Sequence, residues 1–369
     1  MTIGVPKEVK TDEYRVGATP SNVLEFVKDG HEVFIQRSAG EGSGFSDDEY
    51  LKSGAIIVGS AKEVYEGATL IVKVKEPQPS EYELLDEKHT LFCYLHLAPL
   101  KELTSVLVEK KLCAIAYETV AKGGELPLLK PMSQIAGRMA PTVAAHLLSR
   151  YQGGEGVLIS GADGVDSANV LVIGAGNAGY GASEVAYGLG ANVTVINRSS
   201  PKLEEMKKSL PLVKTELYSA SKLEELLKKS DVVISTVLIH GGASTPKLIT
   251  KEMLEGMKKG SVLVDITIDQ GGISESSRPT THTDPIFIDK GVLHYCVANM
   301  PGAYPKTATL ALTNATFPYV QKLANMGSVE AIKDDSSLAL GVNIFKGNIT
   351  NSAVSKISGF EFKTLKTLL

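Results

Sequence analysis

Apolar segments of strand length alternate with helix-like segments along nearly the whole chain, a pattern typical of α/β folds with parallel sheets. Residues 2–5 predict a first strand. Thr19-Pro20 then opens a helix that Gly30 closes, and residues 31–36 predict the second strand. Ser46 and Ser60 each stand three residues before a glutamate and so match a capping box at a helix start. Further strands are expected at residues 69–75, 90–95 and 112–117.

The middle of the chain begins with a long helix. From Ser133, apolar residues recur every four positions up to Leu147, which predicts one buried helical stripe. Pro141 lies within this stripe and should kink the helix. Because glycines and prolines mark the preceding segment, we place a domain boundary near residue 128.

Four apolar strands separated by helical stretches follow, at residues 170–173, 193–196, 232–235 and 261–268. After Pro305 the pattern turns helical again, and residues 306–369 hold too few strands for an independent domain. We therefore expect them to return to the first domain. The fold class is α/β, with two Rossmann-like doubly wound domains and a cleft between them. We expect residues 1–127 plus 306–369 to form one domain, and residues 128–305 to form the other with a mostly parallel sheet.

The composition of the chain excludes several classes of protein. Its 369 residues are 43% hydrophobic, and the net charge of −4 is scattered, which argues against a disordered chain and against capture of nucleic acid or anionic membrane. The three cysteines, Cys93, Cys113 and Cys296, lie far apart, so neither a disulfide framework nor a zinc site is expected. The N-terminus lacks the layout of a signal peptide, and no membrane span is expected, so the protein should be cytoplasmic.

A glycine-rich motif stands where a nucleotide would bind. A strand at residues 169–173 leads into Gly174-Ala175-Gly176-Asn177-Ala178-Gly179, and a helix and a second strand follow. This context distinguishes a dinucleotide loop from a mere Gly-rich turn. Gly174 permits the tight turn, Gly176 lets a pyrophosphate approach the backbone, and Gly179 lets the helix pack closely on the strand.

The end of the second strand leaves the choice of dinucleotide open. An acidic residue usually stands there to bind the adenosine ribose, but this sequence has Asn197-Arg198. Neutral Asn197 beside a guanidinium would admit the 2′-phosphate of NADP. Alternatively, Asn197 still binds the ribose hydroxyl of NAD and Arg198 is a solvated surface charge.

With this loop in place, the chain resembles the alanine dehydrogenase and transhydrogenase α-subunit family nearly end to end. The similarity is carried by these segments: Ile3-Gly4-Val5-Pro6-Lys7-Glu8, Glu13-Tyr14-Arg15-Val16, Val72-Lys73-Val74-Lys75-Glu76-Pro77, Leu95-His96-Leu97-Ala98, Ala116-Tyr117-Glu118-Thr119, Pro131-Met132-Ser133, residues 264–272 and residues 296–301. Beyond about residue 326 the match is looser.

The resemblance implies reversible oxidative deamination of L-alanine to pyruvate and ammonium, with hydride transfer to NAD, or to NADP if Asn197 admits it. It assigns the substrate carboxylate to Arg15, substrate contact and proton handling to Lys75, and acid–base work to His96 and Asp269. It also implies a hexamer, and it makes residues 1–127 plus 306–369 the substrate domain and residues 128–305 the cofactor domain. No metal is expected, because the sequence has no clustered His, Cys or carboxylates. The implied cofactor-binding residues are Ser133, Gly174, Gly176, Asn177, Ala178, Gly179, Asn197, Arg198, Lys202, Ser219, Val237, Leu238, Asp269, Val297, Asn299 and Met300.

The chemistry of these side chains suits the implied reaction. A planar guanidinium such as that of Arg15 can bind a carboxylate through two parallel hydrogen bonds. Lys73 and Lys75 fall on one face of a strand, and near a low-dielectric pocket the pKa of such an ammonium would fall. His96 can move protons near neutrality, and Asp269 follows a strand end where ligands bind in α/β sheets.

Each of these residues also has a simpler interpretation. Arg15 would be a surface charge, Lys73 and Lys75 a solvated strand end, His96 a core histidine, and Asp269 a turn former. Two other functions remain open as well. One is the dinucleotide-binding subunit of a transhydrogenase, and the other is a nonenzymatic dinucleotide sensor.

Overall fold

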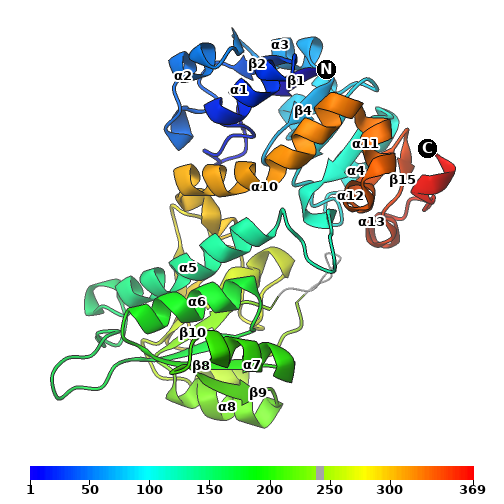
Figure 1. Ribbon diagram of the computed structural model, residues 1–369. Helices are drawn as coiled ribbons and strands as arrows, with labels where there is room; N and C mark the ends of the chain where they lie inside the picture. Colours follow the sequence, from blue (N-terminus) through cyan, green and yellow to red (C-terminus); the bar gives the residue numbers. More distant parts are fainter. Residues whose placement is uncertain (238–244) are drawn as a thin grey trace. The chain divides into compact units, whose positions relative to one another are not determined.

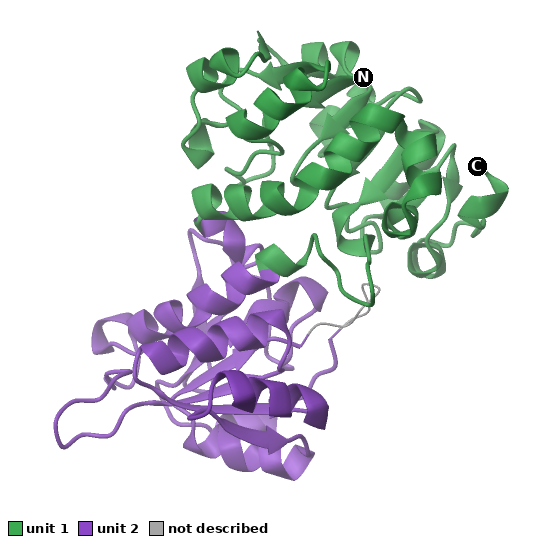
Figure 2. Ribbon diagram, viewed as in Figure 1, with its two compact units in different colours: residues 1–132, 304–369 green, residues 133–303 purple. Residues whose placement is uncertain are grey.

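The computed structural model describes residues 1–237 and 245–369, which divide into two compact units (Figures 1 and 2). Unit 1 comprises Met1–Met132 and Tyr304–Leu369, and unit 2 comprises Ser133–Ala303. The division falls within helix α5 (Lys130–Leu147) and just before helix α10 (Pro305–Met326). The sequence had suggested residues 128 and 306 for these two points.

Unit 1 is built on an eight-stranded sheet in the order β15-β14-β6-β5-β4-β1-β2-β3. Strands β1 to β6 are all parallel, whereas β14 pairs antiparallel with both β6 and β15. The strands are β1 (Thr2–Val5), β2 (Glu32–Gln36), β3 (Ile56–Val58), β4 (Leu70–Val72), β5 (Thr90–Cys93), β6 (Cys113–Ala116), β14 (Val342–Phe345) and β15 (Asn348–Ile349). The C-terminal segment therefore extends the sheet of unit 1.

Helices α1, α2 and α3 of unit 1 begin where the sequence predicts. Thr19 caps α1 and Ser46 caps α2, each through a full capping box, and Ser60 caps α3 by accepting the backbone N–H of Glu63. Phe26 of α1 stacks on Phe317 of α10 at 5.3 Å between ring centroids, which joins the two ends of the chain. The helices are α1 (Pro20–Lys28), α2 (Asp47–Lys52), α3 (Ala61–Gly67), α4 (Lys101–Glu109), α10, α11 (Ser328–Asp334), α12 (Ser336–Gly341) and α13 (Ser352–Ser358).

Unit 2 contains a seven-stranded sheet in the order β12-β13-β11-β10-β7-β8-β9, parallel except where β12 pairs with β13. The sequence predicted four of these seven strands and missed three, β9, β12 and β13. The strands are β7 (Asn169–Ile173), β8 (Asn192–Asn197), β9 (Lys214–Leu217), β10 (Val232–Ser235), β11 (Val262–Asp265), β12 (Ile286–Asp289) and β13 (Val292–Tyr295). The order β9-β8-β7-β10-β11-β13 is that of a Rossmann sheet.

The helices of unit 2 that the structure describes include α5, which continues through Pro141, and α6 (Asn177–Gly188), which directly follows the glycine loop. The others are α7 (Ser200–Ser209), α8 (Ala220–Lys229) and α9 (Lys251–Glu255). Buried apolar residues of α5 and α6 pack with β7, β8, β10 and β11 in one cluster of the core. Across both units, none of the helices in residues 1–237 and 245–369 is long and apolar enough to cross a membrane.

Candidate functional site

Three of the predicted site residues lie beyond the carboxyl ends of neighbouring strands in unit 1. Arg15 follows β1, Lys75 follows β4 and His96 follows β5, and these strands are adjacent in the sheet. The order β3-β2-β1-β4-β5-β6 reverses direction between β1 and β4, and ligands of open α/β sheets bind at such a switch point. The fold thus brings these three residues to one edge of one sheet.

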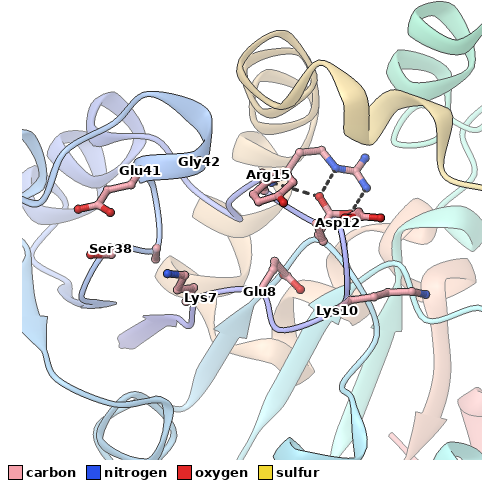
Figure 3. Close-up of a pocket in the computed structure, with 11 residues that line it drawn as sticks. Lys7, Glu8, Lys10, Asp12, Arg15, Ser38, Glu41 and Gly42 are labelled. Carbon is pink, nitrogen blue, oxygen red and sulfur yellow. Dashed lines mark hydrogen bonds and ion pairs between the residues drawn. The ribbon is translucent and has the colours of Figure 1, made fainter. Parts of the chain in front are cut away.

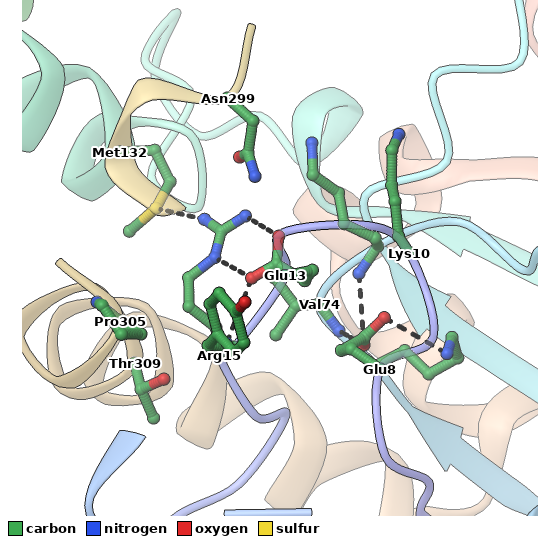
Figure 4. Close-up of polar contacts among 12 residues, drawn as sticks. Glu8, Lys10, Glu13, Arg15, Val74, Met132, Asn299, Pro305 and Thr309 are labelled. Atoms are coloured by element: carbon green, nitrogen blue, oxygen red, sulfur yellow. Dashed lines mark hydrogen bonds and ion pairs between the residues drawn. The ribbon is translucent and has the colours of Figure 1, made fainter. Parts of the chain in front are cut away.

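Arg15 is buried, with 2% of its surface exposed, which excludes the interpretation as a surface charge. Its Nε donates to Glu13 at 2.6 Å, its Nη2 also donates to that carboxylate, and its Nη1 donates to Met132 Sδ at 3.0 Å (Figure 4). Burial alone would raise the pKa of Glu13, but the hydrogen bonds and charge of Arg15 outweigh it and lower this pKa. The guanidinium is therefore held in place by a charged partner, and its Nη1 donates to a sulfur, a weak acceptor that a substrate carboxylate could replace.

The loop that carries Arg15 also lines a cavity of about 370 Å³. Residues 7–15 form one wall, and the turn at residues 38–42 forms the other (Figure 3). Figure 3 shows the Arg15 side chain directed away from Ser38 and Glu41. Arg15 is itself among the residues that line this cavity, beside Glu8 and Glu13.

A buried ionic cluster lies beneath Lys75. Lys73 is fully buried, and its Nζ lies 2.7 Å from Glu81 and 3.3 Å from Glu8. Burial lowers the pKa of Lys73, but the two carboxylates outweigh this effect and raise it above its usual value.

Glu8 also fixes the backbone that carries Lys75. Its carboxylate accepts the N–H of Val74 at 2.6 Å and that of Lys75 at 3.4 Å (Figure 4). Strand β4 consequently ends at Val72, three residues earlier than predicted, because a side chain replaces β1 as the partner of Val74. Lys75 itself is 92% buried, since 8% of its surface is exposed, and it is not a solvated strand end.

Glu8 should make the stability of the protein depend on pH. Burial raises the pKa of Glu8 from 4.5 to about 7, so the folded protein holds this proton where the unfolded chain has released it. This contribution to stability is complete below pH 4.5 and is lost as the pH rises through 7. We expect the free energy of unfolding of the wild type to fall relative to that of Glu8→Gln, by about 2 kcal/mol between pH 5 and pH 8.

Denaturant unfolding of both proteins across this pH range measures the difference. Exposed Glu87→Gln is the matched control, and its pH dependence should follow the wild type. Parallel curves for the wild type and Glu8→Gln would contradict the titration of Glu8.

His96 has an unusual backbone conformation. Its φ angle is +47°, in the left-handed region that costs energy for residues other than glycine. The imidazole stacks on Tyr94 at 5.9 Å between centroids and 10° between planes, and Tyr94 in turn donates to the carbonyl of Leu128. Because strand β5 ends at Cys93 and not at residue 95, His96 lies in the loop beyond the strand, half-buried, and is not a core histidine.

In unit 2, the glycine loop has the conformation that a dinucleotide requires. Gly174 has φ +111°, and a Cβ on Gly179 would lie 2.0 Å from the carbonyl oxygen of Gly174, so both positions require glycine. A Cβ on Gly176 would meet no heavy atom within 4 Å, so the backbone at the start of α6 is open to a ligand. The loop fits a pyrophosphate at a helix N-terminus.

The other residues expected at the cofactor lie around the same sheet. Asn197 ends β8 and donates through Nδ2 to the carbonyl of Ser199 at 3.2 Å, while Arg198 is exposed. Ser219 caps α8 by accepting the N–H of Lys222. Asn177 and Lys202 are exposed, Ser133, Val237 and Asn299 are half-buried, and Ala178, Val297 and Met300 are buried. Leu238 lies outside the described residues.

Asp269 is exposed in the short helix η6 (Ile266–Gln270) that follows β11. Asp265, at the end of that strand, fixes the helix. Its fully buried carboxylate accepts the N–H and the hydroxyl of Thr267, the N–H of Ile273 and the hydroxyl of Ser277. Asp269 therefore projects from a segment that a satisfied buried acid holds in place.

Sequence reasoning missed the acids that support the predicted residues. Glu13 holds Arg15, Glu8 holds the backbone at Lys75, and Asp265 holds the segment of Asp269. The available signal was an acid close in sequence to a strand end or to a predicted residue: Glu8 lies three residues after β1, Glu13 two residues before Arg15, and Asp265 at the last position of β11. Such acids are rarely buried without a partner.

Within residues 1–237 and 245–369, no three or more His, Cys, Asp or Glu side chains lie close enough together to hold a metal ion. All three cysteines are buried and free. Burial raises the pKa of Cys113 to about 12.

Unit 2 has a Rossmann glycine loop. Unit 1, formed by the segments before and after it in sequence, has an Arg, a Lys and a His at its switch point. Together these features define a dinucleotide-dependent oxidoreductase of a small acid. Family models confirm this class. The alanine dehydrogenase/PNT N-terminal domain matches residues 4–136, and the C-terminal domain matches residues 140–352. The chain belongs to the alanine dehydrogenase/PNT family.

Individual relatives agree. Alanine dehydrogenase of Halomonas elongata is 48% identical over 371 residues, with both chains fully covered. A solved structure of an L-alanine dehydrogenase is 44% identical, with a TM-score of 0.93 and coverage of 97% of this chain and 99% of the other. The transhydrogenase from Sinorhizobium meliloti is 26% identical, with a TM-score of 0.81 and coverage of 96% and 100%. The chain is more similar to these dehydrogenases than to this transhydrogenase.

Proposed function

We propose that this protein is an L-alanine dehydrogenase that converts L-alanine reversibly to pyruvate and ammonium. The observation that carries the proposal is the gathering of Arg15, Lys75 and His96 at one switch point, in a chain that shares 48% identity over its full length with an alanine dehydrogenase. When bound, NAD accepts the hydride from the substrate Cα.

In the proposed mechanism, the chain supplies binding, orientation and proton transfer. Arg15 donates to the substrate carboxylate, and Glu13 keeps the guanidinium oriented for this contact. Lys75 contacts the keto oxygen. His96 and Asp269 transfer the protons that imine and carbinolamine formation require. Positioning by these residues supplies much of the rate enhancement.

The cofactor would be held by the backbone of the glycine loop at its pyrophosphate and by Asn197 at its adenosine ribose. Ser133, Lys202, Ser219, Val237, Val297, Asn299 and Met300 would line the rest of its site. Leu238 would join them. This assignment follows the family resemblance, and the open backbone at Gly176 supports it.

Steady-state assays with alanine test the function and separate it from the alternatives. Alanine-dependent formation of reduced nicotinamide is expected, together with its reversal by pyruvate and ammonium. Hydride exchange between two dinucleotides in the absence of alanine would instead identify a transhydrogenase. Binding of NAD without either reaction would identify a sensor.

We also propose that the protein accepts NADP beside NAD because Asn197 carries no charge. Asn197→Asp should then lower kcat/KM for NADP by about 10-fold or more relative to NAD, because a carboxylate repels the 2′-phosphate. Kinetics of the wild type and the variant with each dinucleotide measure this ratio. Arg198→Ala is the companion variant and should weaken NADP alone. An unchanged ratio in Asn197→Asp would contradict the proposed role of this strand end.

Finally, we propose a cytoplasmic homohexamer. The family resemblance suggests the hexamer, and three buried free thiols are compatible with a reducing compartment. Light scattering of the purified protein would measure its mass.

A further inference from the structure

Glu118 is an acid beside the loop of His96 for which the proposed mechanism has no role. It lies in the short helix η3 (Tyr117–Thr119), directly after β6, which is the neighbour of β5 in the sheet. Its carboxylate accepts the N–H of His96 at 2.7 Å and that of Leu95 at 3.2 Å. One side chain thus binds two consecutive peptide groups of the loop that carries His96.

This contact stands where the backbone needs support. A left-handed φ at His96 costs about 1 kcal/mol or more and persists only when the surroundings fix it. The two N–H groups point to Glu118 after β5 has ended, so they would otherwise lack a strand partner. Charge-assisted hydrogen bonds to a carboxylate are among the stronger ones available for this purpose.

The imidazole has a second support of its own. Its ring stacks nearly parallel on Tyr94, and the hydroxyl of Tyr94 is anchored on the carbonyl of Leu128. The peptide groups are thus fixed from η3, and the ring is fixed by Tyr94, the first residue after β5. Because both supports belong to unit 1, the orientation of His96 is set within this unit.

We propose that Glu118 is a positioning residue for His96: its carboxylate holds the backbone of Leu95 and His96 in the conformation that presents the imidazole for proton transfer. The inference rests on the proposed role of His96 in acid–base catalysis. Glu118 acts through the backbone and does not touch the substrate.

A double-mutant cycle between Glu118→Gln and His96→Asn tests this proposal, since asparagine tolerates the left-handed conformation. The glutamine side chain keeps one oxygen that accepts from a backbone N–H, but its NH2 group cannot accept from the other backbone N–H. Glu118→Gln should lower kcat of the full-length enzyme by about 10-fold to 100-fold with less than a twofold change in KM for pyruvate. In the His96→Asn background the same change should have little further effect on kcat.

Controls separate the possible failures. Glu102→Gln removes an exposed carboxylate from the first turn of α4 and should leave kcat unchanged. If Glu118→Gln does not fold, Glu118→Asp replaces it, because it keeps the negative charge. Its shorter side chain should still lower kcat, and in the same non-additive way in the cycle. Additive losses in the cycle, or wild-type kcat in the folded Glu118 variant, would overturn the positioning role. Wild-type kcat in His96→Asn would instead overturn the proposed role of His96, and the inference with it.

Discussion

Arg15→Lys should raise KM for pyruvate by about 100-fold, because a bidentate, charge-assisted contact to a carboxylate is worth roughly 3 kcal/mol. Lysine keeps the charge, but a single ammonium cannot bind both the Glu13 carboxylate and the substrate carboxylate in the geometry of a planar guanidinium. KM for the dinucleotide should change little. Steady-state kinetics of reductive amination measure both constants.

The loss at Arg15 has to be separated from damage to the buried pair. Removing a charge opposite Glu13, whose side chain is fully buried, would leave an uncompensated carboxylate. The double variant Glu13→Gln with Arg15→Met removes both charges, so it should recover stability relative to Arg15→Met but remain defective in pyruvate binding. An unchanged KM for pyruvate in folded Arg15→Lys would contradict the assignment of the carboxylate site.

Lys73→Met should lower the free energy of unfolding by about 3 to 5 kcal/mol, because it removes the cation from the buried acids Glu8 and Glu81. Each acid must then either stay charged without a partner or bind a proton that the unfolded chain has released. Tyr65 donates to Glu81 at 3.0 Å, so the effect should spread through one hydrogen-bonded cluster. Denaturant unfolding near neutral pH measures the loss.

Two further variants test whether buried, unpaired acids cause this loss of stability. Adding Glu8→Gln and Glu81→Gln to Lys73→Met removes the stranded charges and should restore much of the stability. Lys62→Met breaks only an exposed pair, with Glu66 at 3.7 Å, and should cost less than about 1 kcal/mol. If Lys73→Met were no more destabilising than Lys62→Met, the cluster would not have the importance that its burial indicates.

The local features of the fold could be predicted from the sequence. The capping residues Thr19, Ser46 and Ser60 and the glycine loop at Gly174 act within a few residues of their own position, so a short pattern contains the needed information. The return of the C-terminal segment to unit 1 also followed, because that segment has too few strands to form its own core.

Features that depend on tertiary contacts could not be predicted from the sequence. The strands at Lys75 and His96 end early because Glu8 and Glu118, distant in sequence, take the backbone N–H groups there. The edge strand β9 was missed because its Lys-Thr-Glu-Leu segment lacks an apolar run. Burial of Lys73 was also unexpected, since a strand pattern does not show which carboxylates will meet it.

The supporting acids share one physical role. Glu8, Glu13 and Glu118 each fix a predicted substrate-contacting residue of unit 1, either through its backbone or through its charged group. Substrate-contacting side chains that the fold already holds in position lose less conformational entropy when the substrate binds and reacts. The precision of the proposed site therefore depends on residues that are not themselves assigned to the chemistry.

Transfer of deuterium from [2-²H]alanine to the nicotinamide tests the central claim most directly. The account predicts that the reduced dinucleotide formed by the purified protein carries the deuterium, in equal amount to the pyruvate and ammonium produced. Its absence from the dinucleotide, or reduction without pyruvate, would contradict hydride transfer from the alanine Cα.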